Sequence, residues 1–214
     1  MRFAGLLVLA VLATSCTSET ASMPSPDYFC GMEEGSDGEK AVQRTLRSDQ
    51  FITNFYIPTE KLVQRLGSGL RQMKPGSHTS PQYTCSYNPR PKEGSKGVGV
   101  EFSWTSPGAS NWSGVPAKEI ALYDVNGARV ESTYWLSKLF VACRLSGELD
   151  EASRKAVFRV ELSNTLNSER REDAEARKRQ IELLYILAGR ATDALGCEGD
   201  PLEGAPVVKP APAA

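Results

Sequence analysis

The chain has 214 residues, of which 40% are hydrophobic and 24% are charged, and this composition excludes a disordered or fibrous protein. With 25 basic and 26 acidic residues, the formal net charge is -1. That balance argues against a dedicated nucleic-acid-binding protein, because neutralising phosphates requires a surplus of basic side chains. The chain contains one histidine, His78, and an odd number of cysteines, five.

The N-terminal residues follow the order of charge and hydrophobicity found in bacterial export signals. Arg2 precedes an unbroken run of apolar or small residues, Phe3–Ala13. The run is too short for a bilayer-spanning helix, which needs about 20 residues. It does have the length of the apolar region of a signal peptide. We therefore expect residues 1–15 to be a signal peptide.

The end of this region, Leu12-Ala13-Thr14-Ser15-Cys16, resembles the lipobox of bacterial lipoproteins, in which small residues precede an invariant cysteine. Leu12 lies one place further from the cysteine than in the commonest form of that motif. The resemblance implies that Cys16 receives a diacylglyceryl group and becomes the N-terminus after cleavage. Acyl chains such as palmitate would then hold the protein on the outer face of the bacterial cytoplasmic membrane. The alternative is a secreted protein that is cleaved near Ser15.

Both ends of the exported chain have compositions typical of disorder. Residues 16–27 are rich in Ser, Thr and Pro, so we expect a disordered tether between the membrane and the domain. Residues 199–214 are rich in Pro and Ala and are expected to form a disordered tail. Residues 28–198 between them have the length of a single domain.

Apolar periodicity predicts the secondary structure of this domain. Ser36 and Glu39 fit a capping box, which starts a helix. Leu62, Leu66 and Leu70 recur at helical spacing, whereas alternation of apolar and polar residues indicates strands. The first half is expected to contain a helix from Ser36 to about Arg47, a strand over Phe51–Ile57, a helix over Pro58–Met73, and a hairpin with strands over Tyr83–Tyr87 and Val98–Trp104.

The second half contains further strands and a long helix. In the last strand, Phe158, Val160 and Leu162 are expected to point inward, and Arg159 and Glu161 outward. The elements are a hairpin with strands over Ile120–Tyr123 and Arg129–Tyr134, strands over Leu139–Leu145 and Val157–Leu162, and a helix over about Ser168–Leu195. This order predicts an α+β fold, in which helices pack on one face of an antiparallel sheet of four to six strands and the long helix is C-terminal.

If Cys16 carries lipid, four cysteines remain for the domain, and an even number in an exported protein indicates disulfides. Their spacings fit neither a zinc site nor a Cys-x-x-Cys redox pair. Four cysteines allow three pairings. We expect Cys30–Cys85 and Cys143–Cys197, because Cys143 faces the layer in which the final helix packs and Cys197 ends that helix.

This layout, together with three short motifs, resembles that of small actinobacterial cell-envelope lipoproteins. The motifs are Tyr83-Thr84-Cys85-Ser86-Tyr87, Phe140-Val141-Ala142-Cys143 and Ala194-Leu195-Gly196-Cys197. The resemblance spans most of residues 28–198. It implies a location in the cell envelope and brings no active site to carry over to this chain.

The sequence shows no arrangement typical of catalysis, metal binding or cofactor binding. His78 lies in a predicted loop, and there is neither a Gly-x-Ser-x-Gly elbow to present a serine nor a Ser-x-x-Lys motif. The acidic segment Glu33–Glu39 lacks the spacing of a calcium loop. Gly94–Gly99 precedes a strand, whereas a phosphate-binding loop leads into a helix. We therefore predict no catalytic residue, no metal and no cofactor.

The tryptophans are the best candidates for a recognition surface. Trp112 lies in a Pro- and Gly-rich loop, residues 105–118, and Trp104 and Trp135 lie in or beside predicted strands. Exposed aromatic side chains commonly mark binding sites. In the alternative interpretation, Trp104 and Trp135 belong to the core and Trp112 folds back over the edge of the sheet.

Together these observations predict a lipid-anchored envelope protein that binds a partner protein or a cell-wall ligand without catalysis. Two alternatives stay open. One is a hydrolase or enzyme inhibitor with a carboxylate site that the sequence does not reveal, and the other is a structural component of the envelope. A deep cleft with two carboxylates would favour the hydrolase, and an apolar patch around Trp112 would favour the binding module.

Overall fold

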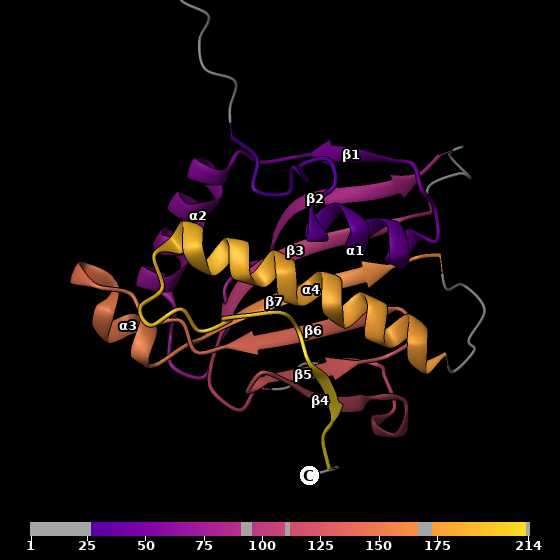
Figure 1. The fold of residues 1–214 in the computed structure, drawn as a ribbon. Coiled ribbons are helices and arrows are strands. Elements are labelled where there is room, and N and C mark those ends of the chain that lie inside the picture. Colours follow the sequence, from indigo (N-terminus) through magenta and orange to yellow (C-terminus); the bar gives the residue numbers. More distant parts are fainter. Residues whose placement is uncertain (1–26, 91–95, 110–111, 167–172, 213–214) are drawn as a thin grey trace, which may run out of the picture.

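The structure, a computed structural model, describes residues 27–90, 96–109, 112–166 and 173–212. The expected signal peptide, the expected lipidation site Cys16 and all but the last residue of the expected tether lie outside this part of the chain. The described residues form an α+β fold in which one antiparallel sheet packs against helices (Figure 1). The sheet has eight strands, which exceeds the expected four to six.

The strand order is β1-β2-β3-β7-β6-β5-β4-β8. The strands are β1 (Phe51–Phe55), β2 (Gln82–Pro89), β3 (Val98–Thr105), β4 (Ala121–Val125), β5 (Ala128–Ser132), β6 (Leu136–Val141), β7 (Val157–Asn164) and β8 (Val208–Pro210). β3 and β7 form the longest pairing, which runs from Val98 opposite Asn164 to Thr105 opposite Val157. These two strands therefore fix the register of the centre of the sheet.

The described residues include four α-helices and two short 3-10 helices. They are α1 (Asp37–Leu46), α2 (Thr59–Gln72), η1 (Ala117–Glu119), η2 (Gly147–Leu149), α3 (Asp150–Arg154) and α4 (Ala174–Leu195). The predicted cap of α1 is present, since the Ser36 hydroxyl accepts a hydrogen bond from the backbone N–H of Glu39 at 3.1 Å. No helix in this part of the chain has both the length and the apolar character needed to cross a membrane.

α4 begins later than expected, at Ala174 behind the N-cap Asp173, whose side chain accepts from the backbone N–H of Ala176. Residues 167–172, in which the start at Ser168 was expected, are not described. The helix ends at Gly196, where a φ of 73° places the backbone in the left-handed region that suits glycine.

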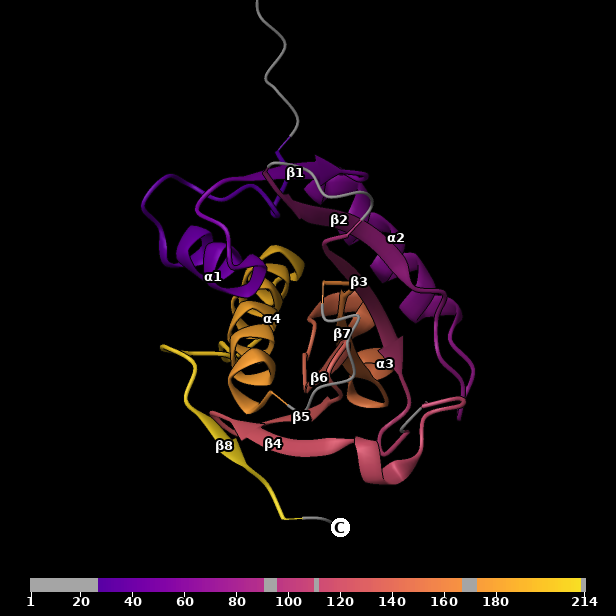
Figure 2. The same cartoon turned by 90° about the vertical axis from the view of Figure 1, so that its right-hand side faces the viewer.

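The hydrophobic core lies between the sheet and the helices, and Figure 2 shows the sheet curving around α4. Strand alternation puts Phe102 and Trp104 of β3 and Phe158 of β7 on this inner side, where all three are fully buried. The Trp104 indole N–H donates to the carbonyl oxygen of Leu66 at 3.2 Å, which joins α2 to the same side of the sheet. The predicted inward face of β7 is therefore confirmed.

Both predicted disulfides are present. Cys30–Cys85 ties the segment before α1 to β2, and Cys143–Cys197 ties the segment after β6 to the end of α4. They join residues 55 and 54 positions apart in the sequence. Each bridge therefore fixes a helix-bearing segment to the sheet that it covers.

The C-terminal segment differs from the expected disordered tail. β8 pairs antiparallel with β4, with Val208 opposite Val125. The Asn126 side chain holds the approach to β8, because its amide N–H groups donate to the carbonyl oxygen of Ala205 at 2.9 Å and its oxygen accepts from the backbone N–H of Val207 at 3.1 Å. A turn residue far away in the sequence therefore orders a segment whose own composition favours disorder.

We expect the double substitution Cys143→Ser and Cys197→Ser to lower the free energy of unfolding by about 2–5 kcal/mol, the usual cost of removing a native disulfide. The physical reason is that the unfolded chain regains the freedom that a cross-link over 54 residues removes. Urea denaturation of the oxidised proteins measures the difference. An unchanged midpoint and slope would contradict the expected contribution of this bridge.

Candidate functional site

One face of the sheet carries a cluster of charged side chains in place of a second layer of helices. α1, α2 and α4 contact the strands from the side of Phe102, Trp104 and Phe158. The opposite side, which we call the open face, receives the alternate residues of the same strands. Across its centre these residues are charged: Glu101 of β3, Arg159 and Glu161 of β7, Lys138 of β6, and Arg129 and Glu131 of β5.

Arg159 is the anchor of this cluster and is only 4% exposed. Its Nε donates to the Ser103 hydroxyl at 3.0 Å, and its Nη2 lies 2.8 Å from Oε1 of Glu161. Lys138 Nζ lies 3.8 Å from the other oxygen of Glu161. A buried charge without partners would cost several kcal/mol, so these contacts are what permits a guanidinium in the sheet. The expected outward direction of Arg159 and Glu161 is correct, but Arg159 is buried there.

Glu101 and Glu161 lie directly opposite each other in the register of β3 and β7, but their carboxylates have different surroundings. The Glu101 carboxylate forms no hydrogen bond or ion pair with any other described residue. Partial burial raises the pKa of the Glu101 carboxyl, the facing charge of Glu161 adds to the rise, and Arg159 opposes it. Of these two facing carboxylates, Glu161 is therefore paired with cations and Glu101 is not.

Trp112 and Lys138 close the other side of the cluster. The indole N–H of Trp112 donates to Glu131, which also pairs with Arg129. The Lys138 ammonium lies 4.4 Å from the centre of the Trp112 ring, a cation–π contact. Burial lowers the pKa of Lys138, and the neighbouring carboxylate of Glu161 acts against that. The loop that carries Trp112 is thereby fastened over β5 and β6.

A cavity of about 320 Å3 opens on this cluster, and we call it the tryptophan cavity. The lining side chains that matter here are Glu101, Trp112, Trp135, Lys138, Arg159 and Glu161. Trp135 is 37% exposed, and its indole makes no hydrogen bond to a described residue. The volume is within the range of small-molecule sites. Two aromatic rings therefore stand over a charged floor.

The three candidate tryptophans occupy different environments. Trp112 and Trp135 come together in the tryptophan cavity. Trp104 is fully buried against Phe158 on the other side of the sheet, with its ring centre 5.1 Å away, so it cannot contribute to a surface. The alternative interpretation, in which the tryptophan belongs to the core, is correct for Trp104. Trp135 is exposed, and Trp112 is partly exposed.

A second hollow of about 280 Å3, which we call the tyrosine cavity, lies on the same open face over β1, β2, β3 and β7. The residues used below are Asn54, Tyr56, Tyr83, Ser86, Asn88 and Ser163. The ring centres of Tyr56 and Tyr83 are 4.9 Å apart, the rings are tilted by 39° to each other, and both are exposed. None of the side chains that line this hollow in the described part of the chain is charged.

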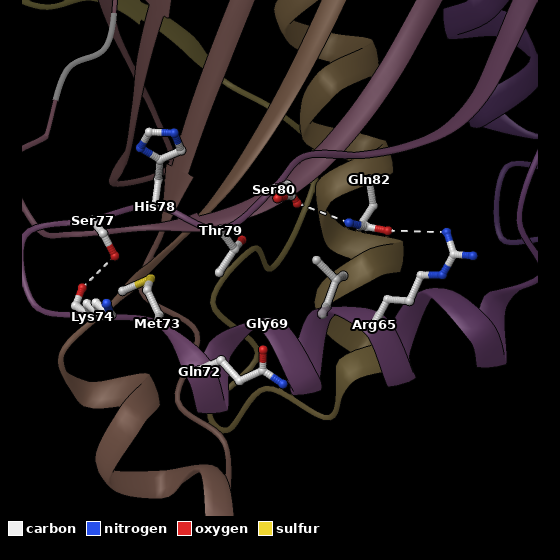
Figure 3. A pocket seen from close by; sticks show the side chains of 11 residues that line it. Arg65, Gly69, Gln72, Met73, Lys74, Ser77, His78, Thr79, Ser80 and Gln82 are labelled. Atoms are coloured by element: carbon white, nitrogen blue, oxygen red, sulfur yellow. Dashed lines mark hydrogen bonds between the residues drawn. The ribbon is translucent and has the colours of Figure 1, made fainter.

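A third hollow of about 340 Å3 lies between α2 and the segment leading to β2, and Figure 3 shows it. Arg65 and Gln82 face each other across it, with a hydrogen bond of 3.5 Å. His78 is among the residues that line this hollow, and it also lines the tryptophan cavity (Figure 3). His78 is exposed, in keeping with the loop that the sequence predicts. No nucleophile and base are paired here.

No three or more His, Cys, Asp or Glu side chains in the described part of the chain come together in a way that could hold a metal ion. The acidic segment Glu33–Glu39 instead caps α1, with the Glu39 carboxylate accepting from the backbone N–H of Gly35. In the charged cluster of the open face, lysine and arginine side chains supply the positive charges that pair with the carboxylates.

Sequence analysis missed Glu101, Glu131 and Lys138. None of the three belongs to a motif typical of catalysis or metal binding, so the sequence alone does not single them out. The available signal was that neighbouring strands carry charges of opposite sign at these positions, but strand order and register decide whether such charges meet. Those two properties follow from tertiary structure.

Comparison with protein-family models, with curated proteins and with solved structures finds no significant match.

We expect Glu101→Gln to raise the melting temperature at pH 7 and to leave it unchanged below about pH 4. A carboxyl whose pKa is raised by folding weakens the folded state once it ionises, so this cost appears above its ordinary pKa of about 4.3. An amide removes the ionisation. Calorimetric melting of both proteins across this pH range measures the effect.

The matched variant Glu161→Gln should have the opposite effect at pH 7. It leaves Arg159 and Lys138 without their shared carboxylate. The expected loss is about 3 kcal/mol, the lower end of the range for breaking a buried ion pair, because Glu101 remains beside Arg159. Effects of opposite sign on stability at pH 7 are the diagnostic result. Two variants with the same sign would show that the carboxylates have equivalent environments.

Proposed function

We propose that the protein is a lipid-anchored binding module of the bacterial cell envelope, which holds its ligand on the open face of the sheet. The tryptophan cavity carries this proposal, because exposed Trp135 and partly exposed Trp112 stand over a hollow with hydrogen-bonding groups at its base. Rigid rings that combine apolar faces with polar edges are the side chains most enriched at binding sites. The ligand is an envelope component, since the N-terminal sequence resembles a lipoprotein signal.

The internal pairing of the charges favours binding over catalysis. Glu161 is held by Arg159 and Lys138, and Glu131 by Trp112 and Arg129. A carboxylate held in this way keeps its charge and its position, which suits a fixed recognition surface. A glycosidase needs one carboxyl group free to donate a proton and a second free to attack or to activate water.

Hydrolysis is the second candidate, and one observation favours it. Glu101 has a raised pKa and faces Glu161 across two strands, which is the environment of a general acid beside a carboxylate. If the protein hydrolyses a glycan, it should release reducing ends from a suspension of purified cell walls, and Glu101→Gln should abolish that release. The binding proposal expects no release from either protein.

The binding proposal predicts that purified protein sediments with a bacterial cell-envelope fraction and that Trp135→Ala removes this retention. Trp135 suits the test because its indole is exposed and has no hydrogen-bond partner among the described residues, so the variant should fold. Phe55→Ala is the matched control, because Phe55 is 42% exposed and lines neither cavity of the open face. Equal retention of the Trp135 variant and of the control would contradict the proposed surface.

The proposed anchor predicts that Cys16→Ser releases the protein from the membrane into the medium, because a serine cannot receive the thioether-linked diacylglyceryl group. Fractionation of a bacterial host that expresses each form, followed by immunoblotting, measures the distribution. Met23→Ser, in the same expected tether, is a control that should stay in the membrane fraction. Membrane retention of the Cys16 variant would rule out this anchor.

A further inference from the structure

The two cavities of the open face are neighbours on the same pair of strands. Glu101 and Glu161 line the tryptophan cavity, and Gly99 and Ser163, two residues along β3 and β7, line the tyrosine cavity. Two residues of a strand span about 7 Å. Tyr83 joins the two cavities, because it lies opposite Glu101 in the register of β2 and β3. An elongated ligand can therefore occupy both.

The tyrosine cavity has the surface that a neutral, hydroxyl-rich molecule needs. The Asn54 amide N–H groups donate to Ser86 at 3.1 Å and to Asn88 at 2.7 Å, and the Tyr56 hydroxyl lies 3.2 Å from the Ser86 hydroxyl. The Asn54 side-chain oxygen accepts no hydrogen bond from another described residue. A fixed network of amides and hydroxyls thus borders two exposed rings.

Gly99 makes room for this arrangement. A β-carbon at this position would lie 2.8 Å from the Tyr83 hydroxyl, so the Tyr83 ring would have to move, and 3.0 Å from the Ser163 hydroxyl, which is a tight contact. The Tyr83 ring therefore lies over the backbone of β3, beside the tilted ring of Tyr56. The absence of a side chain at Gly99 therefore leaves the space in which the Tyr83 ring packs on the open face.

We propose that the ligand is an uncharged glycan chain, which lies across the open face with one sugar ring in each cavity. The pyranose ring has a face of C–H bonds that packs on an aromatic ring, and its rim of hydroxyls both donates and accepts hydrogen bonds. Trp135 and Tyr83 supply the aromatic platforms, and Asn54 is free to accept from a sugar hydroxyl. This inference rests on the proposed function and names its ligand class.

Charge argues against the other elongated ligands. A nucleic acid or a phosphorylated polymer would need cations along its path, and the described lining of the tyrosine cavity has none. In the tryptophan cavity the positive charges of Lys138 and Arg159 already face the carboxylates of Glu101 and Glu161.

The test is a titration of the purified protein with β-linked N-acetylglucosamine and glucose oligomers of increasing length, followed by calorimetry. The affinity should rise at least tenfold from the single sugar to the longer oligomers of one of these series, because a second cavity becomes occupied. Trp135→Ala should abolish binding of every length. Tyr83→Ala should remove only the gain with length, a loss of about tenfold for the long oligomers.

Two further variants distinguish the loss of the Tyr83 ring from a general disturbance of the fold. Tyr83→Phe keeps the platform and should retain the gain with length, whereas Gly99→Ala displaces the ring and should lose it, as Tyr83→Ala does. Phe55→Ala should change nothing. Absence of binding by every oligomer, an affinity independent of length, or an unaffected Tyr83→Ala variant would overturn the glycan assignment.

Retention on the envelope fraction tells the two proposals apart. If that retention depends on Trp135 while no oligomer binds, the glycan assignment fails and the binding module stands. If neither the envelope fraction nor any oligomer is bound, the proposed function itself fails. Binding of the oligomers with unchanged affinity in Trp135→Ala would overturn the site on the open face.

Discussion

β7 imposes the main physical constraint on this protein, because its two sides have opposite chemistry. Phe158, Val160 and Leu162 are fully buried against the helices, and Arg159 and Glu161 occupy the other side. A central strand cannot expose either set to the wrong environment without a large cost in free energy. The helices cover the apolar side chains of β7 on one side, and a cluster of paired charges surrounds Arg159 and Glu161 on the other. The neighbouring strands of the sheet have the same two-sided arrangement.

The charge cluster explains why the open face can stay without a second layer of helices. Arg159 is held by Ser103 and Glu161, and the loop carrying Trp112 covers the cluster through Glu131 and Lys138. These contacts lock several strands in one register, since a slip of one residue would turn the charges into the core. A rigid polar floor with aromatic walls results, and the proposed recognition of a glycan depends on that rigidity.

The sequence revealed most of what depends on local pattern. The cap at Ser36, the strands around Tyr83 and Val98, and the inward face of β7 follow from periodicity that a short window contains. The disulfide pairing also followed, because Cys143 comes just after a strand that the last helix covers and Cys197 comes just after the end of that helix. β8 did not follow, because a segment rich in proline and alanine becomes a strand only when Asn126 and β4 hold it.

The sequence by itself determined the α+β class and the three longest helices, because these depend on periodicity along the chain. The pairing of the cysteines was predicted from the expected packing of the last helix on the sheet, and the structure confirms it. Only the tertiary structure decided which side chains form the candidate site. Glu101 and Glu161 are far apart in the sequence, and the antiparallel register of β3 and β7 makes them neighbours. The sequence places both Trp104 and Trp135 in or beside strands, yet Trp104 is buried on the helix side of β3, whereas Trp135 lies in the turn between β5 and β6 and is exposed.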